Sequence, residues 1–123
     1  MNILIPVLTA EFNFASLNSV TSNDFIVLFL PIDKSSQLRG FAFAAQEASD
    51  CQKKIAEFKQ RLQERKIECT DVVEWCTDVA GKIHALAQLR NCKKIILQKQ
   101  TTHYFEEILN KLKENTEYSI ELI

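Results

Sequence analysis

The 123-residue sequence predicts an α/β domain: a doubly wound parallel sheet of five strands in the order 3-2-1-4-5, with helices on both faces. Short apolar runs that lack polar alternation, such as residues 25–30 (FIVLFL), are typical of strands buried on both faces. Longer segments with apolar residues at helical spacing separate these runs, which favours parallel strands joined by helices. The two glycines and two prolines are too few for the many tight turns of a β-sandwich.

Five segments have the length and apolar character of strands. They are residues 2–8, 25–30, 67–75, 94–98 and 118–123. We expect Pro31 to end the second strand, because proline cannot donate a hydrogen bond to a ladder. The first crossover, residues 9–24, is rich in Ser, Asn and Thr, and we expect one or two helical turns there.

Three segments have helical periodicity. The longest should begin at residues 38–41 and end near Lys66, and its apolar stripe is Ala44, Ala48, Cys51, Ile55, Phe58 and Leu62. This stripe is too short to favour the alternative of a coiled coil. Thr77 or Asp78 should cap the next helix, whose inner face is Val79, Ile83, Leu86 and either Leu89 or the alkyl stem of Arg90. Thr101 or Thr102 should open the last helix, with Phe105, Ile108, Leu109 and Leu112 inward.

The net charge and the length of the apolar runs indicate which partners and which compartment to expect. The net charge of −1 gives no positive field for nucleic acid or an anionic membrane, so we expect neither partner. No apolar run reaches the roughly 18 residues of a membrane span, and Met1 is not followed by a signal-peptide pattern. We therefore expect a single cytoplasmic domain over residues 1–123.

The four cysteines, Cys51, Cys69, Cys76 and Cys92, form no C-x-x-C pair and fit no common zinc spacing. We expect reduced thiols, no metal and no cofactor. The two histidines, His84 and His103, belong to no metal-ligand pattern either. A small thiol-based redox regulator is the alternative that the cysteine count leaves open.

The opening strand carries a family resemblance. Residues 3–11 read ILIPVLTAE, which resembles the ILVPVDGSE opening of universal stress proteins. Residues 77–83 (TDVAGKI) stand where many members of that family read G-D-P-A-x-x-I, and residues 95–97 (IIL) are similar to the family's apolar I-V-M strand. The resemblance covers nearly the whole chain. It implies the family's fold and a dimer formed through the last strand, with Tyr118, Ile120 and Leu122 at the interface.

The chain departs from the family where ATP binds. Leu8 replaces the Asp that contacts the adenine end, and Thr9-Ala10 replaces Gly-Ser. ATP-binding members follow the fourth strand with G-x-x-G and a later G-S or G-T, whereas this chain begins with Gln98-Lys99-Gln100-Thr101 and has no glycine there. Glycines let backbone N–H groups approach phosphate oxygens without a Cβ in the way. The departures therefore predict that ATP is not bound.

Two hypotheses for function follow. The first is a non-catalytic regulatory or stress-response domain that acts as a homodimer or through an unknown protein partner. The second is an atypical nucleotide-binding member of the family. Lys99, Thr101 and Thr102 at a helix N-terminus are the candidate residues for a residual anion site, because backbone donors and the helix dipole favour negative charge there.

Overall fold

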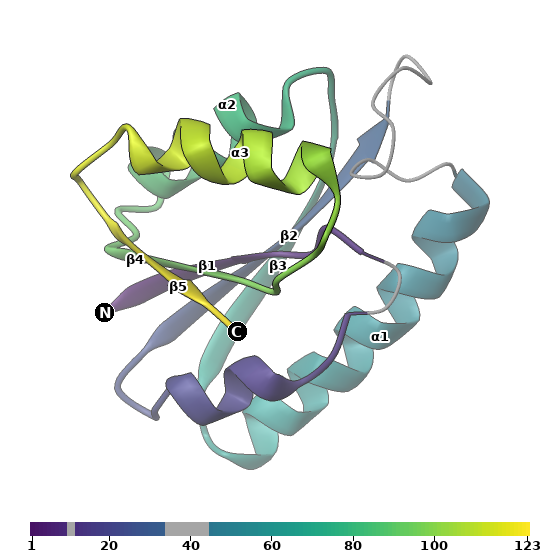
Figure 1. Ribbon diagram of the computed structural model, residues 1–123. Coiled ribbons are helices and arrows are strands. Elements are labelled where there is room, and N and C mark those ends of the chain that lie inside the picture. Colours follow the sequence, from purple (N-terminus) through teal and green to yellow (C-terminus); the bar gives the residue numbers. More distant parts are fainter. Residues whose placement is uncertain (10–11, 34–44) are drawn as a thin grey trace.

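The computed structural model describes residues 1–9, 12–33 and 45–123. Strands and helices alternate along the chain (Figure 1). In order, the described elements are β1 (Asn2–Pro6), the 3-10 helix η1 (Ala15–Ser19), β2 (Phe25–Asp33), α1 (Ala45–Glu64), β3 (Glu68–Cys76), α2 (Val79–Leu89), β4 (Lys94–Leu97), α3 (His103–Lys113) and β5 (Ser119–Leu122). The predicted strands are confirmed, four of them to within two residues at each end.

All five strands are parallel and lie in one sheet with the order β3-β2-β1-β4-β5. β1 is the central strand. It pairs with β2 from Asn2↔Phe25 to Pro6↔Phe29 and with β4 through Ile3↔Lys94 and the following pair. The predicted doubly wound fold and its strand order are therefore confirmed.

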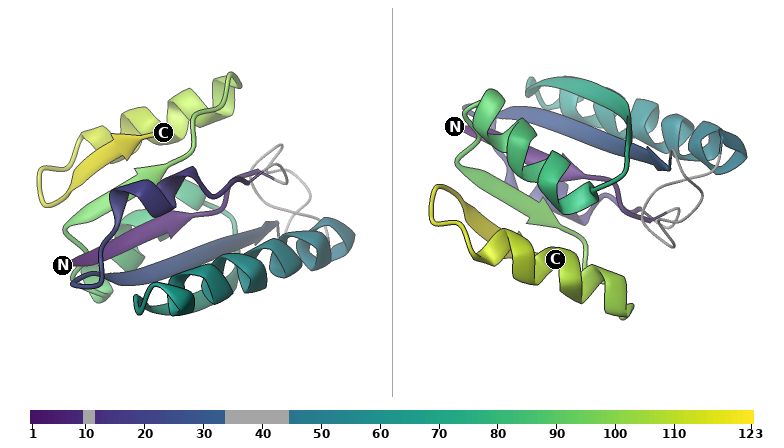
Figure 2. Two further views of the ribbon diagram at one scale, coloured as in Figure 1. Left: turned by 90° about the horizontal axis from the view of Figure 1, so that it is seen from below. Right: turned by 90° about the horizontal axis from the view of Figure 1, so that it is seen from above.

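Both faces of the sheet are buried, which explains why its strands read as continuous apolar runs. Along β1 the side chains alternate between two cores. Ile3 and Ile5 belong to the core under α1 and η1, whereas Leu4 belongs to the core under α2 and α3. Figure 2 shows α1 and η1 on one face of the sheet and α2 and α3 on the other.

The first crossover contains η1, as expected, and aromatic rings hold it against α1. The Phe12 ring lies edge-on to Phe58, with centroids 5.4 Å apart, and the Phe14 centroid lies 5.5 Å from that of Phe58. The guanidinium of Arg65 donates to the carbonyl of Leu17 at 3.0 Å. These contacts position the residues that follow β1.

The prediction that Pro31 ends the second strand is wrong, because β2 continues to Asp33. The reason lies in the register. Phe29 accepts a hydrogen bond from Val7 N, so its backbone groups point toward β1, and those of Pro31, two residues on, have the same orientation. β1 has already ended at Pro6. The missing N–H of Pro31 therefore leaves no ladder bond unmade.

The long helix keeps its predicted stripe where side chains are described. Cys51, Ile55, Phe58 and Leu62 are all buried. Its predicted start, residues 38–41, lies outside the described residues. α1 ends at Glu64, and Lys66 follows with a positive φ of 59°, the conformation that commonly closes a helix.

Asp78 caps α2 by accepting a hydrogen bond from Gly81 N at 3.1 Å. The predicted inner face is correct for Val79, Ile83 and Leu86 but wrong for its last position. Leu89 is 78% exposed and Arg90 is also exposed, because the helix turns both side chains away from the sheet. The small side chains of Ala80 and Ala87 complete the buried face and allow α2 to lie close to the strands. Among the described residues, no helix has both the length and the apolar character needed to cross a bilayer.

Candidate functional site

The strand order places a topological switch point between β1 and β4. The connection after β1 leads to η1 on one face of the sheet, and the connection after β4 leads to α3 on the other (Figure 2). In doubly wound sheets, ligands bind in the crevice that this divergence opens at the carboxyl ends of the strands. The residues that could form such a site are therefore those just after Pro6 and those just after Leu97.

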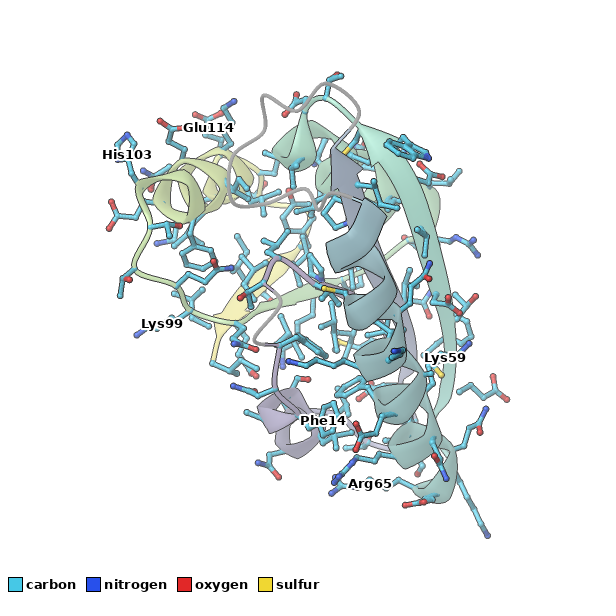
Figure 3. All side chains as sticks on the ribbon, turned by 90° about the vertical axis from the view of Figure 1, so that its right-hand side faces the viewer. Phe14, Lys59, Arg65, Lys99, His103 and Glu114 are labelled. Carbon is cyan, nitrogen blue, oxygen red and sulfur yellow. The ribbon has the colours of Figure 1, made fainter. Side chains whose placement is uncertain are left out.

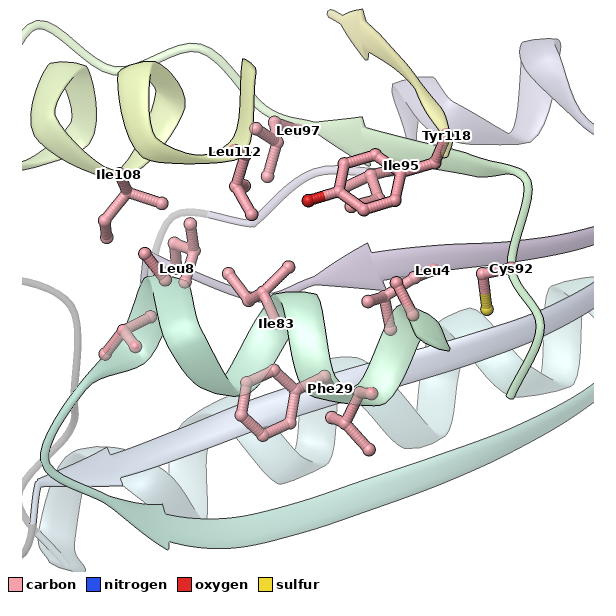
Figure 4. Close-up of a cluster of buried hydrophobic side chains, with 14 of the residues drawn as sticks. Leu4, Leu8, Phe29, Ile83, Cys92, Ile95, Leu97, Ile108, Leu112 and Tyr118 are labelled. Carbon is pink, nitrogen blue, oxygen red and sulfur yellow. The ribbon is translucent and has the colours of Figure 1, made fainter. Parts of the chain in front are cut away.

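Leu8 lies at the first of these ends, but its side chain is turned into the core. It is only 3% exposed and belongs to the apolar cluster beneath α2 and α3. In Figure 4 it points toward Ile83 and Ile108. A buried leucine offers no polar atom to a ligand, so its effect is to continue the core to the edge of the crevice.

Two glutamines from the loop after β4 reach across to the loop after β1. The side-chain amide of Gln100 donates to the carbonyl of Leu8 at 3.1 Å. The side-chain oxygen of Gln98 accepts from the backbone N–H of Asn13 at 2.9 Å. We call these two hydrogen bonds the glutamine clasp. The clasp connects residues 92 and 85 positions apart in the sequence across the switch point.

The backbone of the loop after β4 is also engaged. The N–H of Lys99 donates to the carbonyl of Ile123 at 2.9 Å, which extends the bonding between β4 and β5 by one residue. Every residue of this loop carries a Cβ, since neither glycine of the chain lies in it. A phosphate group would therefore meet side chains and an N–H that is already bonded.

The structure brings Lys99, Thr101 and Thr102 together in the loop that enters α3, as predicted, and all three are exposed. Figure 3 shows Lys99 at this loop, beside the start of α3. The Thr102 hydroxyl caps the helix by accepting from Phe105 N at 3.2 Å. Glu106 lies in the first turn, and Glu107 pairs with His103 at 3.0 Å. Carboxylates thus already occupy the positive end of the helix dipole, which disfavours an added anion. An anion at this site stays a prediction.

Tyr118, predicted for a dimer interface, is buried in its own chain, with 7% exposure. Its hydroxyl lies 3.1 Å from Nδ1 of His84, and burial raises its pKa. Ile120 and Leu122 are half-buried and pack against the same core. Of the three residues, Ile120 and Leu122 keep surface that a partner can contact.

None of the four cysteines forms a disulfide. Burial raises the pKa of both Cys69 and Cys92, which lowers the fraction of reactive thiolate. Within the described residues, His, Cys, Asp and Glu side chains form no group of three that could hold a metal ion. Neither Cys69 nor Cys92 is therefore activated in the way that a thiol-based redox regulator requires.

Sequence reasoning found the loop after β4 but missed the clasp. It treated Gln98 and Gln100 only as residues that are not glycine, and it gave Asn13 no role. A usable signal was present: two long amide side chains, at positions 98 and 100, directly follow the fourth strand.

Compared with protein-family models and with curated proteins, the sequence has no match. Compared with solved structures, it resembles a universal stress protein family member from Burkholderia pseudomallei, with a TM-score of 0.61 and 12% identity, over 99% of this chain and 94% of that one. It also resembles the universal stress protein of Archaeoglobus fulgidus, solved in complex with dAMP, with a TM-score of 0.62 and 13% identity, over 100% and 97% of the two chains. The chain has the universal stress protein fold.

Proposed function

We propose that this protein is a non-catalytic regulatory or stress-response domain on the universal stress protein fold. In this proposal it does not bind ATP, and it acts in the cytoplasm as a homodimer or through a protein partner. The observation that carries the proposal is the glutamine clasp. Gln100 bonds to Leu8 and Gln98 bonds to Asn13, so the crevice is spanned by the chain's own side chains.

A nucleotide in this crevice would have to break the two clasp hydrogen bonds, each worth about 1 kcal/mol to the folded chain. It would gain neither an acceptor from Leu8 nor a glycine loop for its phosphates. Because a Kd of 1 mM corresponds to only about 4 kcal/mol, these losses are sufficient to keep affinity weaker than millimolar.

The homodimer part of the proposal rests on the free edge of β5. Ser119 N and Ile123 N both donate to β4, so the backbone groups of Ile120, between them in alternation, point away from the sheet. Leu122 has the same orientation. A second β5 strand can pair with these groups, and the half-buried side chains of the two residues supply apolar contact at the same edge.

Native mass spectrometry of the protein purified from its own cells tests both parts at once, because it reports subunit number and retained ligand together. We expect a dimer mass without an adenine nucleotide. A stoichiometric nucleotide adduct would contradict the first part. A monomer at every concentration would contradict the homodimer and leave a protein partner as the surviving form of the proposal.

A further inference from the structure

We propose that the outer edge of β3 binds an extended segment of a partner protein, which joins the sheet as a sixth strand. The inference rests on the partner-binding form of the proposed function and names the surface involved. β3 is the last strand on its side of the sheet, at the edge opposite β5.

The register shows which backbone groups face outward. Phe29 accepts from Val7 on β1, so the even-numbered residues of β2 bond to β3. Since Ile26 lies opposite Cys69, the residues of β3 that bond to β2 are the even-numbered ones, such as Val72. The alternate residues, which are Cys69, Asp71, Val73 and Trp75, direct their N–H and C=O groups away from the sheet. A row of donors and acceptors at this spacing fits one kind of partner, an extended backbone.

Apart from its acidic side chains, this edge lacks, in the part of the chain that the structure describes, the features by which proteins usually protect edge strands. β3 has nine residues with no proline, and its pairing with β2 continues without a bulge. Two large apolar side chains on the α1 side of the strand face solvent, with Val73 36% and Trp75 59% exposed. An added strand would cover both.

A groove of about 580 Å³ lies beside this edge, between α1 and β3. Ile55, Ala56 and Gln60 line it from the helix, and Lys59 pairs with Asp71 across it at 2.6 Å. Figure 3 shows Lys59 between the two elements. Because the two charges in the groove neutralise each other, side chains that enter it should be uncharged.

Charge favours a different protein over a second copy of this chain. β3 carries Glu68, Asp71 and Glu74 and no lysine or arginine. Lys59 and Lys82 pair with the last two of these acids, and Glu68 remains exposed. A second β3 has no lysine or arginine that could complement the exposed Glu68, whereas a lysine in a partner segment would complement it. The predicted ligand is thus an extended segment in which apolar residues alternate with lysine or threonine.

Trp75 is the only tryptophan in the chain, so its fluorescence reports on this edge directly. The probe is a peptide as long as β3, in which valine alternates with lysine and threonine. We expect it to shift Trp75 emission to the blue and to slow amide exchange at Asp71, Val73 and Trp75. The same peptide with N-methyl groups on its β3-facing amides should bind about tenfold more weakly or worse, since it lacks those donors.

Val73→Pro removes one outward N–H without breaking the ladder to β2, so it should fold and lose the response. If Val73→Pro does not fold, Trp75→Ala replaces it as the test variant. Because Trp75→Ala has no tryptophan fluorescence, amide exchange then reports on peptide binding. Leu89→Ala, at an even more exposed apolar site on α2, should respond as the wild type does. The proposal is overturned by no response at millimolar peptide, or by equal binding of the methylated peptide. It is also overturned if the edge amides are already protected in the protein alone as its concentration rises, because a second copy then occupies the edge. None of these outcomes bears on ATP or on β5.

Discussion

Gln98 and Gln100 carry long amide side chains, and both of these side chains bond to the loop after β1. At the residue scale, these bonds form contacts within the chain at the carboxyl ends of β1 and β4. Leu8 contributes from the other side, since its carbonyl accepts from Gln100 while its side chain is buried. Gln98, Gln100 and the carbonyl of Leu8 thus take part in spanning the switch point.

Gln100→Ala should lower the free energy of unfolding by about 1 kcal/mol, because the carbonyl of Leu8 loses its amide donor. Urea denaturation measures this. Lys99→Ala, at the exposed neighbouring position, should change it by less than about 0.5 kcal/mol. Equal effects of the two substitutions would show that the clasp bond contributes nothing to stability.

Glu121 makes stability depend on pH. A hydrogen bond from Ser19 and the ion pair with Lys94, at 2.9 Å, hold the pKa of Glu121 below its ordinary value of 4.5. A carboxyl whose folded pKa is lowered stabilises the protein above the unfolded pKa, and this contribution is lost as pH falls through the folded value. Glu121→Gln should therefore lose less stability than the wild type on acidification below pH 4.5. Urea denaturation at several pH values tests this, with Ser19→Ala expected to be intermediate. Parallel losses in all three proteins would count against the pairing.

At the element scale, η1 and the residues before it serve as a support for the clasp. Asn13 lies between Phe12 and Phe14, and both rings contact Phe58 of α1. The guanidinium of Arg61 lies 4.6 Å from the centroid of the Phe14 ring, on the outer side of this cluster. The position of the Asn13 N–H, and therefore of Gln98, depends on how these rings pack.

Phe12→Ala and Phe14→Ala should lower the free energy of unfolding by different amounts. Phe12 is 5% exposed, so its truncation leaves a cavity and should cost about 3–5 kcal/mol. Phe14 is only half-buried and should cost less. Chemical denaturation of both variants measures the difference, and a larger loss for Phe14 would mean that its contact with Arg61 outweighs burial.

The elements that sequence reasoning predicted well are those decided by local pattern. Two-sided burial makes a strand such as β2 a continuous apolar run, and the stripe from Cys51 to Leu62 is visible as helical spacing. The features that sequence reasoning missed depend on contacts between residues that are far apart in the sequence. Pro31 is tolerated inside β2 because β1 ends early, and Leu89 is exposed because small alanines supply the contact surface of α2. The clasp joins residues more than 80 positions apart, which no local pattern encodes.

At the scale of the whole molecule, no further strand of the described residues pairs with either edge of the sheet, while the switch point is spanned. β5 ends the sheet on one side and β3 on the other. We therefore expect this protein to bind its partners at the sheet edges and not at the carboxyl ends of the central strands. A second copy would bind at β5, and a partner segment would bind at β3.

Ile120→Lys should shift the proposed dimer toward monomer, because it places a charge at an apolar edge contact. Sedimentation velocity over a range of concentrations measures this, with circular dichroism to check that the variant is folded. Leu122→Lys should act in the same way. Leu89→Lys, at an exposed site on α2, is the matched control and should remain dimeric. A wild-type protein that sediments as a monomer at high concentration would remove β5 as a dimer edge.

We propose above that the spanned switch point excludes ATP. Calorimetric titration of ATP with magnesium into the wild-type protein tests it most directly. We predict no saturable heat at ATP concentrations up to about 1 mM, since affinity should be weaker than the roughly 4 kcal/mol which that Kd represents. Saturable binding with a micromolar Kd would contradict the account, because the nucleotide would then have to displace Gln98 and Gln100 from their bonds or bind elsewhere on the fold.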